Sequence, residues 1–236
     1  MNKKIHVFLL LFCFFCTDLC AQKQKVKNQP YGDHKLYHFG ITVGFNFQDV
    51  ILTNNGIPAE DGTGTWYATI PDYSPGFSVG LLADMYLNPF LNLRFTPSLH
   101  FGDKAFEFVE PTTNQHFSSV VRSSYLTVPL DLKIRSMRLN NYRPYLLAGV
   151  YGALDLGTRK DEPILFKPFD YGFTLGLGCD FYLPIIKVAP ELRFSFGLAD
   201  IIEHNRTDIT DNSIRKYSES LSKGTSRMIT LSFNFE

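Results

Sequence analysis

Apolar side chains recur at every second position in eight separate stretches of this sequence. Between residues 37 and 47, every odd position is aromatic or aliphatic and every even position is small or polar. Successive side chains of a β-strand point to opposite faces, so each stretch predicts a strand with one apolar face. The stretches are 37–47, 77–87, 91–101, 126–134, 144–155, 171–183, 192–198 and 229–235, and only in 144–155 is the facing ambiguous.

The connectors between these stretches alternate between long and short. The long ones are 49–73, 103–122, 156–168 and 199–224, and the short ones are 87–90, 136–142 and 184–187. This alternation places all long connectors at one end of an up-and-down meander, as in outer-membrane barrels with short periplasmic turns and long external loops. Most stretches have about 9 to 13 residues, enough for a tilted strand to cross a bilayer. The sequence therefore predicts an all-β fold, an eight-stranded antiparallel up-and-down outer-membrane β-barrel.

Aromatic residues near the predicted strand ends suggest the girdle that such barrels place at the membrane interfaces. The candidates are Tyr37, Tyr86, Phe90, Tyr125, Tyr142 and Tyr171.

A soluble lipocalin-like barrel, with the apolar face turned inward around a ligand, is the competing architecture. Alternation alone does not say which face is outside. The polar face is rich in glycine, including Gly40, Gly44, Gly80 and Gly176, which suits a crowded interior better than a solvated exterior. This composition and the loop asymmetry favour the membrane barrel.

The N-terminus has the pattern of a secretory signal. Lys3 and Lys4 precede an apolar run over 5–16, and the sequence TDLCAQ follows over 17–22, with a plausible cleavage point after Ala21. A lipoprotein signal with Cys20 as the lipidated residue is the weaker alternative, because a bulky leucine precedes it. We expect a signal peptide at 1–21, a periplasmic segment at 22–35, a barrel at 36–236 and localisation in the cell outer membrane.

Charge composition excludes some partners. The chain has 23 basic and 23 acidic residues, so bulk charge does not favour nucleic acid.

If the apolar face is outside, the other face places charges in the lumen, where an unpaired charge would cost several kcal/mol. We expect a structural network of ion pairs among Asp84, Arg94, Asp131, Lys133, Asp180, Glu191 and Arg193. Eight strands enclose a lumen just wide enough for side chains to fill, so the barrel should not conduct proteins or sugars.

Catalytic signals are weak. Ser98, His100 and Asp103 could be imagined as a triad, but His100 is better interpreted as a hydrogen-bonding luminal residue. The remaining histidines show no zinc spacing, and GFTLGLG over 172–178 lacks the nucleotide-binding spacing. We expect no catalytic or metal site, no cofactor and no small-molecule substrate. An enzyme acting on lipid or peptide through His100 is the remaining catalytic hypothesis.

Several stretches resemble one family of outer-membrane proteins. They are QPYGDHKLYHFGITVGFN, LNLRFTPSLHFGDK, YLTVPLDLKIRSMRLNNYRPYLLAGV, GLGCDFYLPIIKVAPELRFSFGLADII and ITLSFNFE. Together they are similar to the PorT (SprT) family of Bacteroidota, which is associated with type IX secretion and, in some members, gliding motility. The resemblance implies a non-enzymatic barrel needed to export cargo with a C-terminal sorting domain, and it carries over no active-site residues. Its implied partners are outer-membrane lipid and other secretion-system membrane proteins.

The first long connector has aromatic residues of the kind that protein interfaces use. Trp66, Tyr67 and Tyr73 lie there among glycine and proline, and we expect them to contact a partner. The alternative function is a general surface barrel that adheres or binds ligands through its external loops, unrelated to secretion.

Overall fold

A computed structural model describes residues 26–56, 67–69, 75–110, 115–157, 165–203 and 221–236. Within these residues the chain is almost entirely strand, with one short 3-10 helix, η2 (Gly32–His34). No helix among them is long and apolar enough to cross a membrane. The strands are β1 (Tyr37–Asn54), β2 (Tyr67–Thr69), β3 (Pro75–Asn88), β4 (Leu91–Phe95), β5 (Ser98–Glu110), β6 (Gln115–Arg135), β7 (Tyr142–Asp155), β8 (Phe169–Tyr182), β9 (Lys187–Gly197) and β10 (Leu221–Phe235).

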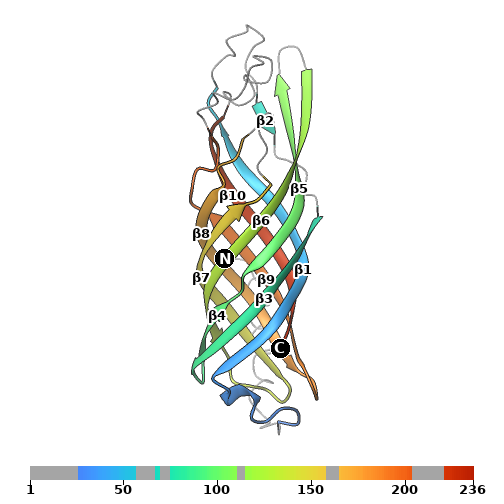
Figure 1. The fold of residues 1–236 in the computed structure, drawn as a ribbon, viewed down its shortest axis with the longest axis vertical. Coiled ribbons are helices and arrows are strands. Elements are labelled where there is room, and N and C mark those ends of the chain that lie inside the picture. The colour runs from blue at the N-terminus through green and yellow to red at the C-terminus, as the bar shows by residue number, and fades with distance from the viewer. Residues whose placement is uncertain (1–25, 57–66, 70–74, 111–114, 158–164, 204–220) are drawn as a thin grey trace, which may run out of the picture.

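The strands form one antiparallel sheet that closes on itself. Going round the ring, β1 pairs with β10, and β9, β8, β7 and β6 follow in turn. From β6 the ring continues through β4 and β5 to β3, and β3 pairs back onto β1 with Phe45 opposite Phe77. Figure 1 shows the tilted strands wrapped around a common axis.

Two of the ten strands add no position to this ring. β4 and β5 keep one register against β6, with Phe95 opposite Leu130 before the break and Ser98 opposite Thr127 after it. Pro97 lies in the break and has no N–H to donate, so the two strands are one barrel strand with an interrupted ladder. Among the described residues, β2 pairs with β5 alone, at Glu107–Val109. The ring therefore has eight positions, and the predicted eight-stranded antiparallel up-and-down barrel is confirmed.

The apolar face is on the outside of the barrel. Phe39 is 73% exposed and Leu81 is 64% exposed, whereas Arg94 on the other face is fully buried. A soluble barrel would bury the aromatic face, so the lipocalin-like alternative does not fit. The ambiguous stretch 144–155 is β7, where Leu146 and Val150 point outward and Tyr145 is buried inside.

The apolar exterior has the height of a bilayer core. On β1 the outward residues are apolar from Tyr37 to Phe47, which spans about 33 Å of strand at about 3.3 Å per residue. A tilt of about 45° reduces this to the apolar band of about 25 Å that such barrels present. Just beyond Phe47, Asp49 forms an ion pair with Arg227 on β10, which marks the upper limit of the apolar belt.

Two of the predicted girdle residues do not face outward. Tyr125 is buried inside the barrel, and Tyr86 is partly buried under the guanidinium of Arg135, 5.4 Å from its ring centroid. Both have the luminal parity of their strands, so that part of the prediction was wrong. Tyr37, Phe90, Tyr142 and Tyr171 are exposed, as a girdle requires.

The predicted loop 103–122 is largely strand. β5 runs to Glu110 and β6 starts at Gln115, and the two strands are paired from Asp103 opposite Arg122 up to Glu110 opposite Gln115. The alternation inverts here, because Phe108 is fully buried on the inner face while Glu107 and His116 are exposed. Above the membrane the outside is water, so the outer face becomes polar, and a search for apolar outer faces misses the strands.

The belt predicts that an outward charge is costly only within it. Ile41 and Ile51 are outward residues of β1, the first at the centre of the belt and the second above the Asp49–Arg227 pair. We expect Ile41→Arg to lower the free energy of unfolding by about 2–4 kcal/mol and Ile51→Arg by about 0–1 kcal/mol. Denaturant titration of the heat-modifiable folded form measures both, and equal losses would contradict the assigned belt.

Candidate functional site: the barrel interior

Arg94 is the centre of a buried ion-pair network in the lower half of the barrel. Its Nη2 lies 2.8 Å from Oδ2 of Asp84 on β3, and its Nη1 lies 2.8 Å from Oε2 of Glu191 on β9. Nη2 also lies 3.2 Å from Oε1 of Glu236, directly after β10. One guanidinium thus forms ion pairs with three carboxylates, one on β3, one on β9 and one directly after β10.

Lys133 extends this network to β8. Its Nζ is 2.8 Å from Oδ2 of Asp180 and 3.6 Å from Oδ2 of Asp84. The Lys133 ammonium lies 4.0 Å from the ring centroid of Tyr145, and the Tyr145 hydroxyl donates a 2.8 Å hydrogen bond to Glu191. Tyr145 therefore contacts Lys133 through its ring and Glu191, a partner of Arg94, through its hydroxyl.

Arg193 completes the set predicted from the sequence. Its Nη2 is 3.0 Å from both Asp131 Oδ2 and Glu191 Oε1, and the Thr174 hydroxyl donates to the other Asp131 oxygen. The structure thus brings all seven predicted luminal residues into one connected group. Asp131, Lys133 and Arg94 have no exposed surface.

Three members of the network were not found from the sequence. Glu236 continues the luminal parity of Ser232 and Asn234, so extending the alternation by one residue pair would have found it. Lys187, which forms an ion pair with Glu236, was assigned to a turn. Tyr145 belongs to β7, where the two parities could not be distinguished.

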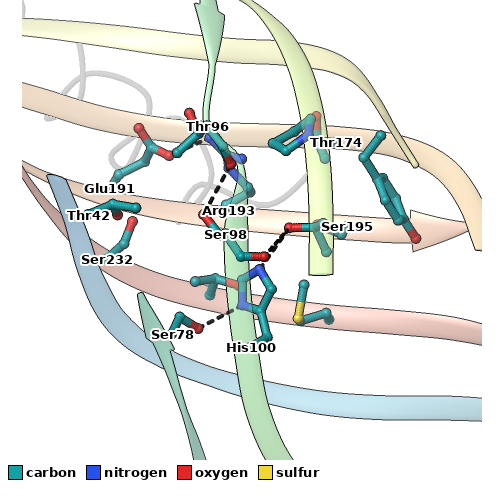
Figure 2. A pocket seen from close by; sticks show the side chains of 15 residues that line it. Thr42, Ser78, Thr96, Ser98, His100, Thr174, Glu191, Arg193, Ser195 and Ser232 are labelled. Atoms are coloured by element: carbon teal, nitrogen blue, oxygen red, sulfur yellow. Dashed lines mark hydrogen bonds and ion pairs between the residues drawn. The ribbon is translucent and has the colours of Figure 1, made fainter. Parts of the chain in front are cut away.

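A small polar cavity lies next to this network. It is lined mainly by hydroxyl side chains and has about 30 Å³ of space that the centres of water molecules can reach, room for about two or three waters. Figure 2 shows His100 in this cavity beside Ser78. A 2.7 Å hydrogen bond joins His100 Nδ1 to the Ser78 hydroxyl, and a 2.9 Å bond joins its Nε2 to Thr127.

The residues of the imagined triad are not assembled. Ser98 donates its hydroxyl proton to the backbone oxygen of Thr96, not to His100. Asp103 is exposed on the outer face. Both ring nitrogens of His100 are bonded to hydroxyls, so no carboxylate orients the imidazole as a base. Within the described ranges, no group of three or more His, Cys, Asp or Glu side chains is placed to hold a metal ion.

The N-terminal segment covers the end of the barrel that has the short turns. Asp33 lies 3.2 Å from both Arg138 and Arg143, and it accepts a hydrogen bond from Tyr182. Asn28 binds the same end through Asn141 and the Tyr182 backbone oxygen. Burial alone would raise the pKa of Asp33, but the Tyr182 hydrogen bond and the two guanidinium charges outweigh it and hold this pKa below its ordinary value.

Near the opposite end, the described residues form a buried apolar cluster, here called the apolar cap. Phe108 is fully buried and contacts the ring of Phe117, with centroids 6.4 Å apart. The buried cluster around it consists of Val50, Phe108, Phe166, Ile201, Ile202 and Leu221. The described interior therefore contains a polar seal, an ion-pair layer, a small hydroxyl-lined cavity, a second small cavity beside Tyr125 and Asp170, and an apolar cap.

Part of the predicted partner-contact loop is described. Tyr67 begins β2, is 41% exposed and lies opposite Val109 on β5. Trp66 and Tyr73 lie outside the described residues, as does the expected signal peptide at 1–21. Of the expected periplasmic segment 22–35, the part from residue 26 is described.

Residues 20–203 match the family model for the outer membrane protein beta-barrel domain, which is more than half of the 236-residue chain. The chain belongs to this family. It is therefore a protein of the outer membrane, where the apolar belt contacts lipid. By the rule for such barrels the short turns are periplasmic and the longer connections are external.

Several solved structures are similar to this chain. Neisserial surface protein A shares 11% identity with a TM-score of 0.42, covering 85% of this chain and 98% of its own. OprG from Pseudomonas aeruginosa shares 14% identity with a TM-score of 0.44, covering 84% and 94%. The outer membrane protease OmpT from Escherichia coli shares 8% identity with a TM-score of 0.36, covering 91% and 99%. A comparison with curated protein sequences gives no match.

The network predicts a large effect when its central cation is removed. Arg94→Met leaves the buried carboxylates of Asp84 and Glu191 short of a partner, which should cost about 3–5 kcal/mol of unfolding free energy. Glu107→Gln is the matched control, because it breaks the exposed Glu107–His116 pair and should cost about 1 kcal/mol or less. Denaturant titration compares the two, and a similar small loss in both would refute the structural importance of the buried network.

The attachment of the N-terminal segment in the polar seal should depend on pH through Asp33. Because its folded pKa is depressed, the stabilisation is complete above the unfolded value of about 4 and is lost as pH falls through the folded pKa. NMR signals of residues 28–33 should become those of a mobile chain over that acid range. Asp33→Asn should release the segment at neutral pH, whereas Tyr31→Ala, an exposed change in the same segment, should not. Retention of the segment in Asp33→Asn at neutral pH would contradict this assignment.

Proposed function

We propose that this barrel is a non-enzymatic accessory or assembly component of type IX protein secretion, required for export of cargo with a C-terminal sorting domain. The resemblance to the PorT (SprT) family supports the specific system, including the link of some members to gliding motility. The closed lumen is the observation on which the proposal depends. A barrel whose centre holds the fully buried Arg94, bonded to three carboxylates, offers cargo no passage.

The luminal residues then have a structural role. Asp84, Arg94, Asp131, Lys133, Asp180, Glu191 and Arg193 hold the walls together through shared ion pairs. His100 belongs to the same interior and acts as a hydrogen-bonding residue, supported by its two hydroxyl partners. Chemistry on an external substrate would need a reactive group open to that substrate, and His100 is only 5% exposed.

The protein must then contact its partners at the ends of the barrel or on its lipid-facing surface. At the external end we propose the loop with Trp66, Tyr67 and Tyr73 as the contact with another secretion-system membrane protein, since aromatic side chains dominate such interfaces. The domain plan consistent with this is a signal peptide at 1–21, a periplasmic segment at 22–35 and the barrel at 36–236. Cargo crosses through a larger partner, because water-filled channels need about 16 strands.

Gene deletion followed by analysis of culture-medium proteins tests the proposal. Sorting-domain cargo should be lost from the medium and accumulate in the periplasm, and the wild-type gene should restore export. Unchanged export, with a defect only in adhesion or ligand binding, would favour a general surface barrel unrelated to secretion.

Complementation locates the contact. The triple variant Trp66→Ala, Tyr67→Ala, Tyr73→Ala should fold, as judged by its heat-modifiable band, yet restore export poorly. Tyr31→Ala, which removes an exposed aromatic from the periplasmic end, should restore export fully. Normal export in the folded triple variant would exclude this loop as the contact.

A further inference from the structure

Basic residues accumulate at the periplasmic end of the barrel. The N-terminal segment and the three short turns, over 26–36, 87–90, 135–143 and 183–187, contain one acidic residue, Asp33. The basic residues of the same stretches are Lys27, Lys35, Arg135, Arg138, Arg143 and Lys187. Because the whole chain has equal numbers of acidic and basic residues, this excess is local, and it favours an anionic partner at this end.

The three arginines of this group face the barrel axis. Arg135 and Arg143 are buried and have the luminal parity of β6 and β7. The guanidinium of Arg138 lies 3.6 Å from the ring centroid of Tyr182, which is itself buried. Lipid contacts the outward face of the strands, so an anion reaches these guanidiniums along the barrel axis, from the periplasm.

One carboxylate already binds among the arginines. Asp33 lies 3.2 Å from both Arg138 and Arg143, which shows that a carboxylate fits between these two side chains. Lys187, the other buried cation at this end, forms an ion pair with Glu236. Asp33 therefore balances only one of the three arginine charges.

Arg135 lacks an ion-pair partner among the described residues. Its Nη2 donates a 3.1 Å hydrogen bond to the backbone oxygen of Asn88, and its guanidinium lies over the ring of Tyr86. Its Nε has no hydrogen-bond partner within the described ranges, although only 4% of the residue is exposed. Such a buried guanidinium, with an unbonded N–H beside the Asp33 site, points to an anion that binds there.

The neighbouring sequence supplies no further carboxylate for this guanidinium. Asp84 in the lumen is already shared by Arg94 and Lys133. Between the expected cleavage point and the described N-terminal segment, residues 22–25 read QKQK. The other ranges outside the description lie between strands that are joined at the external end, and they are 57–66, 70–74, 111–114, 158–164 and 204–220.

The segment that carries Asp33 is held through polar contacts. Asn28, Gln29 and Asp33 bind the turns by hydrogen bonds and ion pairs. No side chain described within 26–36 is fully buried, and Tyr31 is 82% exposed. In Figure 1 this blue segment lies across the lower end of the barrel. Polar contacts contribute little net free energy each, about 0.5–1.5 kcal/mol, so another anion can replace this segment.

We propose that the three arginines bind an acidic segment of a periplasmic protein, and that Asp33 occupies this site until the acidic segment displaces it. Two or more neighbouring carboxylates pair with Arg135 as well as with Arg138 and Arg143, which Asp33 does not do. Guanidinium groups bind carboxylates in a defined two-bond geometry, and charge complementarity selects an acidic partner. This contact lies at the opposite end from the external loop and does not depend on a role in secretion.

Binding of a defined acidic peptide tests the site. The probe is a fluorescent peptide with four aspartates among glycine and serine, and its control has asparagine in place of every aspartate. The mature chain is held in nanodiscs of zwitterionic lipid, and fluorescence anisotropy gives the Kd. The acidic peptide should bind at least about tenfold more tightly than the control at about 50 mM salt, and more weakly at about 0.5 M salt. Equal affinity for both peptides would overturn the proposal.

Removal of the internal competitor should strengthen binding. Asp33→Asn takes the carboxylate away from the arginines, so the Kd of the acidic peptide should fall at least about tenfold, because the site is no longer occupied by the chain itself. Tyr31→Ala changes the same segment without touching the arginines and should leave the Kd within about twofold. An unchanged Kd in folded Asp33→Asn would overturn the displacement of Asp33 by a partner.

Two charge removals separate the arginine site from bulk charge. Arg135→Gln should raise the Kd at least about tenfold, whereas Lys35→Gln removes the same charge at an exposed position and should raise it about twofold or less. The heat-modifiable band verifies folding of both variants. Equal losses in the two would overturn the site, and if Arg135→Gln does not fold, the Asp33→Asn measurement decides alone.

Two further outcomes would identify a different anion. Loss of peptide binding in nanodiscs that contain phosphatidylglycerol would assign the arginines to an anionic lipid headgroup. Displacement of the peptide by inorganic phosphate at the same concentration would assign them to a small free anion. Either result would overturn the proposal of a protein partner.

Discussion

The pairing of β1 with both β10 and β3 is the constraint on which the rest of the structure depends. In lipid no water is available to bond an open strand edge, so a sheet that crosses a bilayer must close. Closure also determines which side chains face lipid. Because lipid surrounds the ring, the apolar side chains at alternate positions must point outward. Every luminal charge is then enclosed by the other face of the same strands.

The interior follows from this enclosure. Eight strands leave a lumen about as wide as its own side chains, so charges there either pair or destabilise the fold. Arg94 and Lys133 meet this demand by sharing carboxylates from several strands, and Tyr145 fills the space between them. Such a network ties strands that are far apart around the ring, and it leaves the lumen without a route for cargo. The assisting role in secretion proposed above would then be carried out at the two ends and on the outer wall.

The ring was predictable because its signal is local. Within the belt, the lipid on one side and the packed polar lumen on the other impose opposite demands on successive residues, and strands such as β1 and β8 alternate without exception. β7 was ambiguous since Leu147 and Tyr151 are apolar on the inner face, where packing against other luminal residues replaces the polar rule. The external part of β5 and β6 was missed for a related reason, because water outside and an apolar cap inside reverse the pattern at Phe108.

The partners within the network were less predictable than its members. Parity identified the seven predicted charges as luminal, but the contact between Arg94 and Glu236 depends on the barrel register, which no single strand contains. The cover formed by Asp33 over the periplasmic end likewise joins segments more than 100 residues apart. Such contacts can be identified only once the three-dimensional structure of the closed ring is known.

Single-channel recording in a planar bilayer tests the closed interior most directly. The purified, folded protein should give no stable conductance on the scale of a porin, because the ion-pair layer and the apolar cap block the lumen. A stable porin-like conductance from the wild-type protein would contradict the account, since it would require a continuous water-filled path past Arg94.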